Sequence, residues 1–168
     1  DTSVLMQESY FKSTSRIAQL FNLASKGYIK ILLPIITKQE WIKHIKESTY
    51  IKFDDVKRKL QLLGNLPNVL KFVDDFEKST STYANIVVDS IDTQILNGKV
   101  EVIDYSFFSD TLSDVFDKYF KKTKPFGSNG KSKEFPDAFV LAALEKYAVK
   151  NSIEQIIIFS NDKDMIQY

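Results

Sequence analysis

Four carboxylates stand at the edges of apolar elements, where side chains from distant parts of a chain can meet. Asp162 directly follows the apolar run 153–160, and Asp137 opens the helix that precedes this run. Glu40 lies one turn into another predicted helix, and Asp1 would join the group if it ends a strand. Ligands of open parallel α/β sheets bind at the carboxyl ends of the strands. We therefore predict that these four residues converge on one rim.

Carboxylates that converge repel one another, and a bound divalent cation offsets this repulsion. The chain has no cysteine and one histidine, so the available ligands are oxygen atoms, which favour Mg²⁺ or Mn²⁺ over zinc. Two such ions about 3.5 to 4 Å apart can stabilise the attacking and leaving oxygens of phosphodiester hydrolysis. The residue types therefore predict nuclease chemistry.

The elements that must position these groups alternate between helix and strand. Apolar runs predict strands at 28–36, 99–105 and 153–160. Helical spacing predicts helices at 11–24, 37–48, 111–121 and 136–149, and a helical insert at about 50–97. Such alternation favours an α/β layered sandwich around a parallel sheet.

Length and composition set the limits of this interpretation. The chain has 168 residues, of which 43% are hydrophobic, so we expect a single domain over residues 1–168. A strand before Asp1 and elements after Tyr168 could be missing from the sequence.

The net charge of +1 does not decide the function. The absence of cysteine favours the cytoplasm, and no apolar run reaches the roughly 18 to 20 residues of a membrane span.

Several stretches resemble the motifs of PIN-domain nucleases in both order and spacing. They are DTSVLM, LPIITKQEW, EFPDAFVLAALEKYA and IIIFSNDKD. The sequence is most similar to a bacterial PIN-like subgroup in which a basic loop with the letters PFG precedes EFPDA. The resemblance covers nearly the whole chain except about 50–98.

The resemblance implies a three-layer Rossmann-like sandwich and the cleavage of RNA with Mg²⁺ or Mn²⁺. It implies that the catalytic metal ligands are Asp1, Glu40, Asp137 and Asp162, and Asp164 matches a further position that is often acidic. The predicted function is that of a metal-dependent endoribonuclease, in which water activated by the metal attacks phosphorus.

Two lysines and two serines are the predicted substrate contacts. Lys131 and Lys133 belong to a basic loop that runs into Asp137, and their charge could neutralise phosphates. Ser3 and Ser160 match small hydroxyl positions that orient the first and last aspartates in similar enzymes. Single-stranded RNA is the expected partner, because no element suited to a major groove is evident. An inhibitory protein partner and a homo-oligomer are both compatible with the sequence.

Each acidic residue also has an explanation that involves no ligand. Thr37 and Glu40 have the spacing of a capping box, and Asp137 would be favoured by the dipole of its helix. Asp162 and Asp164 could be turn residues after a strand. His44, the only histidine, is flanked by lysines and is expected at the surface.

Three other classes of protein compete with the nuclease. A haloacid dehalogenase phosphatase needs an acid where Ser3 stands, and a von Willebrand adhesion domain needs a serine where Leu5 stands. A catalytically inactive PIN-like module that binds nucleic acid or protein fits the sequence as well as an enzyme does.

Overall fold

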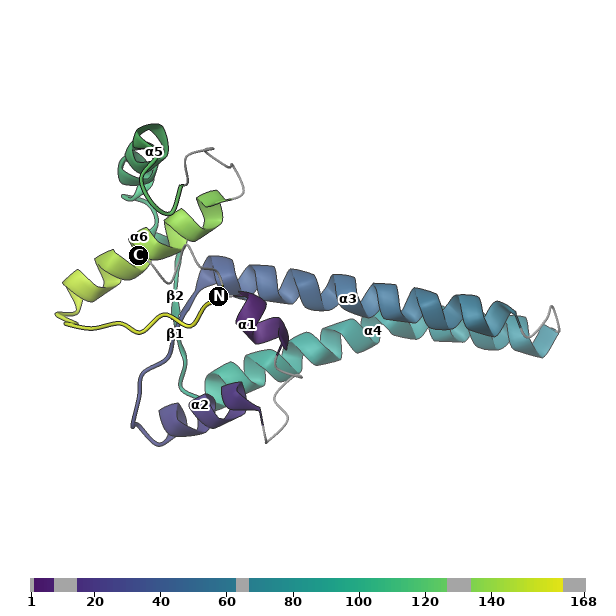
Figure 1. Ribbon diagram of the computed structural model, residues 1–168. Coiled ribbons are helices and arrows are strands. Elements are labelled where there is room, and N and C mark those ends of the chain that lie inside the picture. The colour runs from purple at the N-terminus through teal and green to yellow at the C-terminus, as the bar shows by residue number, and fades with distance from the viewer. Residues whose placement is uncertain (1, 8–14, 63–66, 127–133, 162–168) are drawn as a thin grey trace.

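The computed structural model describes residues 2–7, 15–62, 67–126 and 134–161, and within these ranges the chain is mostly helical (Figure 1). The α-helices are α1 (Thr2–Gln7), α2 (Arg16–Ser25), α3 (Ile35–Gln61), α4 (Pro67–Asn97), α5 (Leu112–Lys121) and α6 (Phe135–Lys150). The strands are β1 (Leu32–Pro34) and β2 (Glu101–Ile103), and the 3₁₀-helix η2 spans Tyr105–Phe107. No helix of the described ranges is both long and apolar enough to cross a membrane.

The two strands form a parallel pair, in which Leu32 lies opposite Glu101 and Pro34 opposite Ile103. Both strands fall within the runs predicted from the sequence. The described residues contain only this two-stranded sheet and not the central sheet of a three-layer sandwich. The parallel pairing joined by helices agrees with the expected α/β class, whereas the number of strands is smaller than predicted.

The run 153–160, predicted to be a buried strand, is extended but pairs with neither described strand (Figure 1). Ile157 keeps 71% and Phe159 keeps 55% of its accessible surface, whereas Ile153 and Ile156 pack partly against the cluster around α6. The prediction of a strand in the sheet is therefore wrong for this structure. The physical reason is that an apolar run becomes a buried strand only when a neighbouring strand pairs with it.

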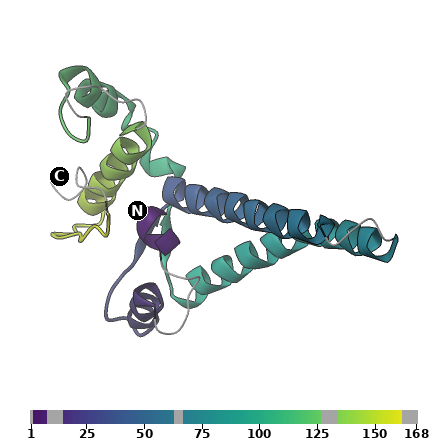
Figure 2. The same cartoon turned by 45° about the vertical axis from the view of Figure 1, so that its right-hand side comes forward.

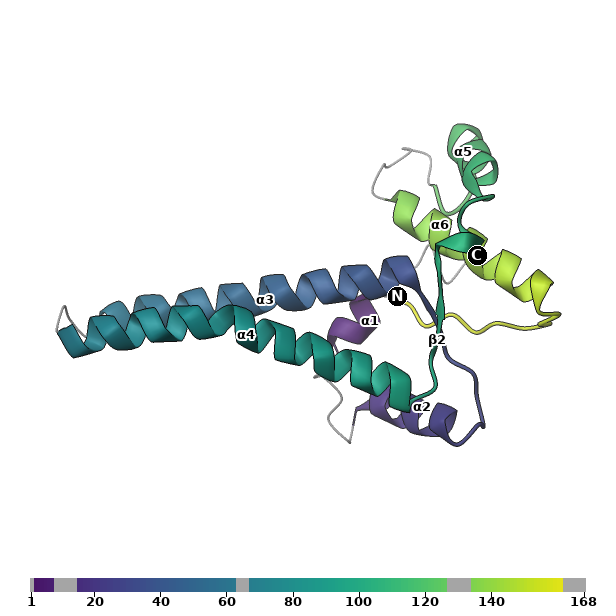
Figure 3. The same ribbon diagram turned by 180° about the vertical axis from the view of Figure 1, so that it is seen from behind.

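Helices α3 and α4 form a long antiparallel hairpin that projects from the rest of the molecule (Figures 1 and 3). The sequence predicted a helix over 37–48 and a separate helical insert that starts near residue 50. Neither helix contains glycine, and proline occurs only at Pro67, where α4 begins. Nothing in these sequences breaks a helix, and the insert is therefore continuous with the helix that carries Glu40.

The base of the hairpin is buried, and its outer part exposes several large apolar side chains. Trp41 and Ile45 of α3 belong to one cluster with Ile91 and Ile95 of α4, and each is at most 6% exposed. Farther along the hairpin, Phe72 is 57% exposed. The base of the hairpin, together with α2 and β1, therefore forms one core of the molecule.

A second core lies on the opposite side of the strands, around α6. The sequence predicted this helix over 136–149, in close agreement with the observed bounds. Val140, Ala143 and Leu144 cluster with Ile103 of β2, and the first residues of α3, Ile35 and Ile36, pack against the same cluster. The first turns of α3 and α6 therefore lie close to the same core.

Candidate active site

The edge at which the strands end is the place where the predicted site residues should meet. β1 ends at Pro34 and α3 begins at the next residue, so Glu40 lies between the first and second turns after the strand. Asp137 lies in the first turn of α6. Because Ile35 and Ile36 pack on the cluster that includes Val140, the two carboxylates belong to neighbouring helix starts (Figure 2).

Glu40 is held by a residue from the beginning of the chain. Thr2 Oγ1 donates a hydrogen bond of 3.0 Å to Glu40 Oε2. Thr2 is buried and Glu40 is half-buried. This contact joins α1 to the start of α3 and orients the carboxylate of Glu40.

The capping-box interpretation of Glu40 is wrong. Helix α3 begins at Ile35, its N-cap is Pro34, and no side chain caps it. Thr37 is therefore a buried residue inside the first turns of the helix. The proline ends the strand and the helix starts directly after it, which moves Thr37 past the capping position.

A second contact joins the start of the chain to its last described residues. Asn161 Nδ2 donates a hydrogen bond of 3.3 Å to Ser3 Oγ. Ser3 is exposed and Ser160 is half-buried. Together with the Thr2 contact, this bond brings α1, the start of α3 and the end of the run 153–161 to one place.

Asp137 is half-buried at the start of a 16-residue helix. Backbone N–H groups and the helix dipole favour negative charge at such a position. The position is therefore suited to an ionised carboxylate, whether or not it binds a ligand.

Several predicted site residues lie outside the described residues, namely Asp1, Asp162, Asp164, Lys131 and Lys133. Within the described ranges, no group of three or more acidic, histidine or cysteine side chains could hold a metal ion. The cluster of four carboxylates therefore stays a prediction. Its two described members, Glu40 and Asp137, belong to the neighbouring first turns of α3 and α6.

A further carboxylate, Asp104, lies at this edge but was not among the predicted site residues. Asp104 directly follows β2 and is the N-cap of η2. Its Oδ1 accepts hydrogen bonds from the hydroxyl and the backbone N–H of Ser106, and these bonds lower the pKa of Asp104 below its ordinary value. An aspartate placed directly after a predicted strand was the available signal. Its capping bonds explain its position without a ligand.

His44 is at the surface, as predicted. Its side chain is 52% exposed, and Nδ1 lies 3.5 Å from Glu47 Oε2 on the next turn of α3. The residue is thus part of an exposed face of the hairpin.

Parallel strands joined by helices define an α/β domain. The sequence model of the family described as PIN domain matches residues 1–165 of the chain. The chain belongs to the PIN-domain family. Neither curated proteins nor solved structures give a significant match.

Membership of this family places the chain among proteins with a Rossmann-like α/β fold and a nuclease-type function. PIN-domain nucleases generally use divalent metal ions. The parallel pair of β1 and β2, with its helical connection, is the part of this fold that the described residues form.

Proposed function

We propose that the protein is a metal-dependent endoribonuclease whose site lies at the carboxyl edge of the sheet. One observation supports this proposal above the others: Thr2 and Ser3 contact Glu40 and Asn161, respectively. Asp1 and Asp162 adjoin Thr2 and Asn161 in the sequence. These contacts join α1 to the start of α3 and to the end of the run 153–161, which supports the proposal that the first and last predicted ligands act together with Glu40.

The residues proposed as metal ligands are Asp1, Glu40, Asp137 and Asp162, with Asp164 as a fifth. All five offer carboxylate oxygens, a donor set that suits Mg²⁺ or Mn²⁺. When bound, such an ion supplies Lewis-acid stabilisation of the charge that develops on the phosphate oxygens. The two described ligands fit this role because neither is fully buried.

The other proposed residues position the RNA and the carboxylates. Thr2 holds Glu40 in one orientation, and Ser3 and Ser160 lie next to the segments of Asp1 and Asp162. Lys131 and Lys133 are proposed to contact phosphates, which would favour single-stranded RNA without strong sequence preference.

The proposal is tested by incubating circular and linear single-stranded RNA with the protein and Mg²⁺ or Mn²⁺, with and without EDTA. We expect cleavage of the circular RNA, because an endonuclease needs no free end, and we expect EDTA to abolish it. Asp137→Asn should abolish cleavage as well. The matched control is Asp114→Asn, since Asp114 is also an aspartate in the first turn of a helix, α5, but outside the proposed site.

Intact RNA under both metals, for substrates of varied sequence, would contradict the enzyme. Binding of RNA without cleavage would then support the catalytically inactive module. If Asp137→Asn and Asp114→Asn lower cleavage equally, the assignment of Asp137 to the active site is wrong. The nuclease activity of the parent protein would still stand.

A further inference from the structure

Helix α5 exposes an apolar stripe on the side that does not pack on the domain. Leu112, Phe116 and Phe120 recur every four residues, so they lie on one side of the helix. Phe120 is 74% exposed, whereas Val115 on the inner side is fully buried. We call Leu112, Phe116 and Phe120 the outer stripe of α5. Neighbouring exposed apolar side chains of this kind mark a binding surface.

The rings of the outer stripe belong to a row that reaches the proposed active site. The ring centroids of Phe120 and Phe116 are 6.2 Å apart and the ring planes differ by 28°, as in stacked rings. The centroid of Phe116 in turn lies 5.4 Å from that of Phe135. Phe135 is the first residue of α6, which packs beside α5 (Figure 1), and Asp137 follows two residues later. The row therefore leads from an exposed ring to the helix start that carries a proposed metal ligand.

Positive charge gathers at the exposed end of the outer stripe. The segment 118–124 contains four lysines, namely Lys118, Lys121, Lys122 and Lys124. Lys121 Nζ lies 2.9 Å from Asp117 Oδ2. Lys118 Nζ lies 3.7 Å from Glu145 Oε2. Lys122 forms no ion pair with a described residue. The lysines thus outnumber the carboxylates that pair with them, and this end of α5 favours an anionic ligand.

Exposed rings beside lysines are the groups with which proteins bind single-stranded nucleic acid. Bases of any sequence stack on aromatic side chains, and lysines contact the phosphates. In a double helix the faces of the bases are covered by their neighbours, so such a surface binds unpaired RNA. A helix of another protein would cover the apolar side chains as well. It would account neither for the surplus of lysines nor for a row of rings that ends at α6.

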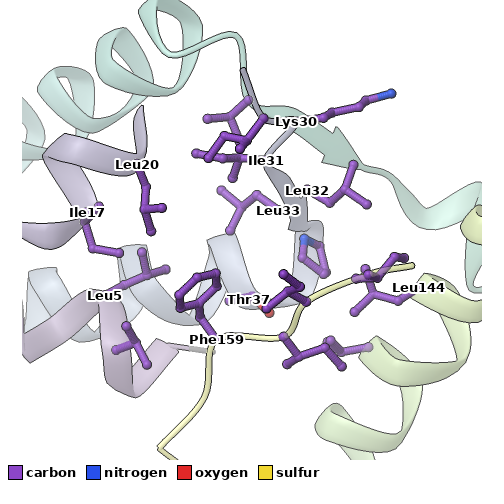
Figure 4. A pocket seen from close by; sticks show the side chains of 18 of the residues that line it. Leu5, Ile17, Leu20, Lys30, Ile31, Leu32, Leu33, Thr37, Leu144 and Phe159 are labelled. Carbon is purple, nitrogen blue, oxygen red and sulfur yellow. The ribbon is translucent and has the colours of Figure 1, made fainter. Parts of the chain in front are cut away.

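An apolar cavity elsewhere in the molecule lacks these features. It has a volume of about 510 Å³, lies along β1, and is lined mainly by aliphatic side chains such as Leu5, Leu33 and Leu144 (Figure 4). Lys30 is the one charged residue in the described lining. A nucleotide has a charged phosphate and polar base edges, and burial of such groups without partners is costly. The cavity is therefore unsuited to RNA.

We propose that the outer stripe of α5 is a subsite for unpaired RNA bases, in which Phe120 and Phe116 stack on nucleotides beside the phosphate that is cleaved. The subsite rests on the proposed nuclease function and extends it from the metal ligands to the choice of substrate. Phe120 contributes more than Phe116, because more of its ring is exposed. Stacking on rings selects RNA by its lack of pairing and not by its sequence.

Binding of a labelled single-stranded RNA in EDTA tests the subsite, because the proposed metal-dependent cleavage does not occur there. Phe120→Ala should weaken this binding by at least about 5-fold, as expected when one base loses its stacking partner. The matched control is Phe72→Ala. The exposed ring of Phe72 stacks on Phe76, with centroids 6.5 Å apart, but it lies near the far end of the hairpin, away from α5 (Figure 3). This control should bind RNA as the parent does.

Two further variants separate stacking from simple apolar contact. Phe120→Trp keeps an aromatic ring and should bind single-stranded RNA at least as tightly as the parent. Phe120→Leu keeps an apolar side chain without a ring and should weaken binding as the alanine does. A duplex of the same sequence should bind the parent and Phe120→Ala equally. Because Phe120 is exposed, these variants should fold, and circular dichroism checks this.

Several results would overturn the subsite. They are equal affinity of Phe120→Ala and Phe72→Ala for single-stranded RNA, full binding by Phe120→Leu, and no binding by the parent. A molecular mass that rises with concentration in the parent but not in Phe120→Ala would assign the outer stripe to a second copy of the chain, and would overturn the proposal as well.

Failure of the subsite and failure of the nuclease give different results. Cleavage by the parent, together with unchanged binding and unchanged kcat/KM in Phe120→Ala, overturns the subsite alone. Binding that depends on Phe120, without cleavage under any metal, overturns the nuclease alone and supports α5 as an RNA-binding surface.

Discussion

The two ends of the short sheet use their charged groups in different ways. At the amino end, Lys30 Nζ lies 2.6 Å from Glu101 Oε2 and donates to the hydroxyl of Tyr147 at 2.6 Å. The Tyr147 hydroxyl in turn donates to Glu101 Oε1 at 2.5 Å. At the carboxyl end, Glu40 accepts a hydrogen bond from the neutral Thr2, and no described residue forms an ion pair with it.

This difference supports the proposal that Glu40, and not Glu101, binds a metal ion. The pKa of Glu101 lies below its ordinary value, mainly because Lys30 bonds the ionised form. Glu101 therefore already has a positive partner in the folded chain. Glu40 has no such partner among the described residues and is oriented by a neutral hydroxyl, which agrees with its proposed role as a metal ligand.

The largest expected effect separates the two glutamates. Glu40→Gln should lower the rate of RNA cleavage by at least about 100-fold, because a charge-stabilising group is lost from the site. Glu101→Gln, the matched change at the amino end, should leave cleavage unchanged. The measurement is kcat/KM for a labelled RNA, with circular dichroism to show that both variants are folded. Equal cleavage rates in the two variants would show that the amino and carboxyl ends of the sheet do not differ in function.

The second prediction concerns the turn that leads into β2 at the amino end. A Cβ atom on Gly98 would lie 2.7 Å from Cδ1 of Phe21, a buried residue of α2. Gly98→Ala should therefore destabilise the fold by about 1 to 3 kcal/mol through overpacking. Urea unfolding measures the change, and Gly27→Ala is a useful comparison because nothing lies near its Cβ position. Gly27 has a φ of +80°, so any loss there reports backbone strain and not packing.

A smaller effect is expected when the hydroxyl that links the amino-end charges is removed. Tyr147→Phe keeps the buried ring but loses a hydrogen bond to Glu101 and one from Lys30. We expect a loss of about 1 kcal/mol of unfolding free energy, since both charged partners are well exposed. RNA cleavage should not change. A variant as stable as the parent would show that solvent replaces these bonds.

The smallest effect is the pH dependence of the amino-end pair. The pKa of Glu101 in the folded chain is below its usual 4.5. The ionised carboxylate therefore stabilises the fold fully above pH 4.5, and this stabilisation is lost as the pH falls through the pKa of the folded state. Lys30 has its pKa raised above 10.5, mainly by its bond to Glu101, so its contribution is complete below that value and disappears as the pH rises further.

Thermal unfolding measured from pH 7 to pH 3 checks the acid side. The melting temperatures of the parent and of Glu101→Gln should differ at pH 7 and converge at low pH. A constant difference across this range would mean that the ion pair is not its origin.

Much of the local structure was predictable from the sequence, because periodicity and breakers act over a few residues. The helix predicted over 136–149 and the two strands are close to the observed elements. The hairpin was divided wrongly, because the helix over 37–48 was predicted to end before an insert that begins near residue 50, although no proline or glycine stands between them. The run 153–160 was assigned from its apolar character, but pairing depends on a partner that residue types alone do not supply.

The site was predictable only in part, for a similar reason. The positions of Glu40 and Asp137 in the first turns of their helices followed from the order of elements, whereas the metal site stays a prediction. The contact between Thr2 and Glu40 joins residues 38 apart in the chain. No local pattern encodes such a contact, and a plausible local alternative, the capping box, proved wrong.

The helical hairpin also affects the order in which the molecule can fold. β1 and β2 are neighbours in the sheet, yet a helix of 27 residues and another of 31 residues separate them along the chain. Direct closure of so long a loop would be entropically costly. Each helix, however, forms from local bonds, and their antiparallel association brings the ends of the hairpin together. We therefore expect the hairpin to assemble before the sheet, so that the strands pair late and at little further entropic cost.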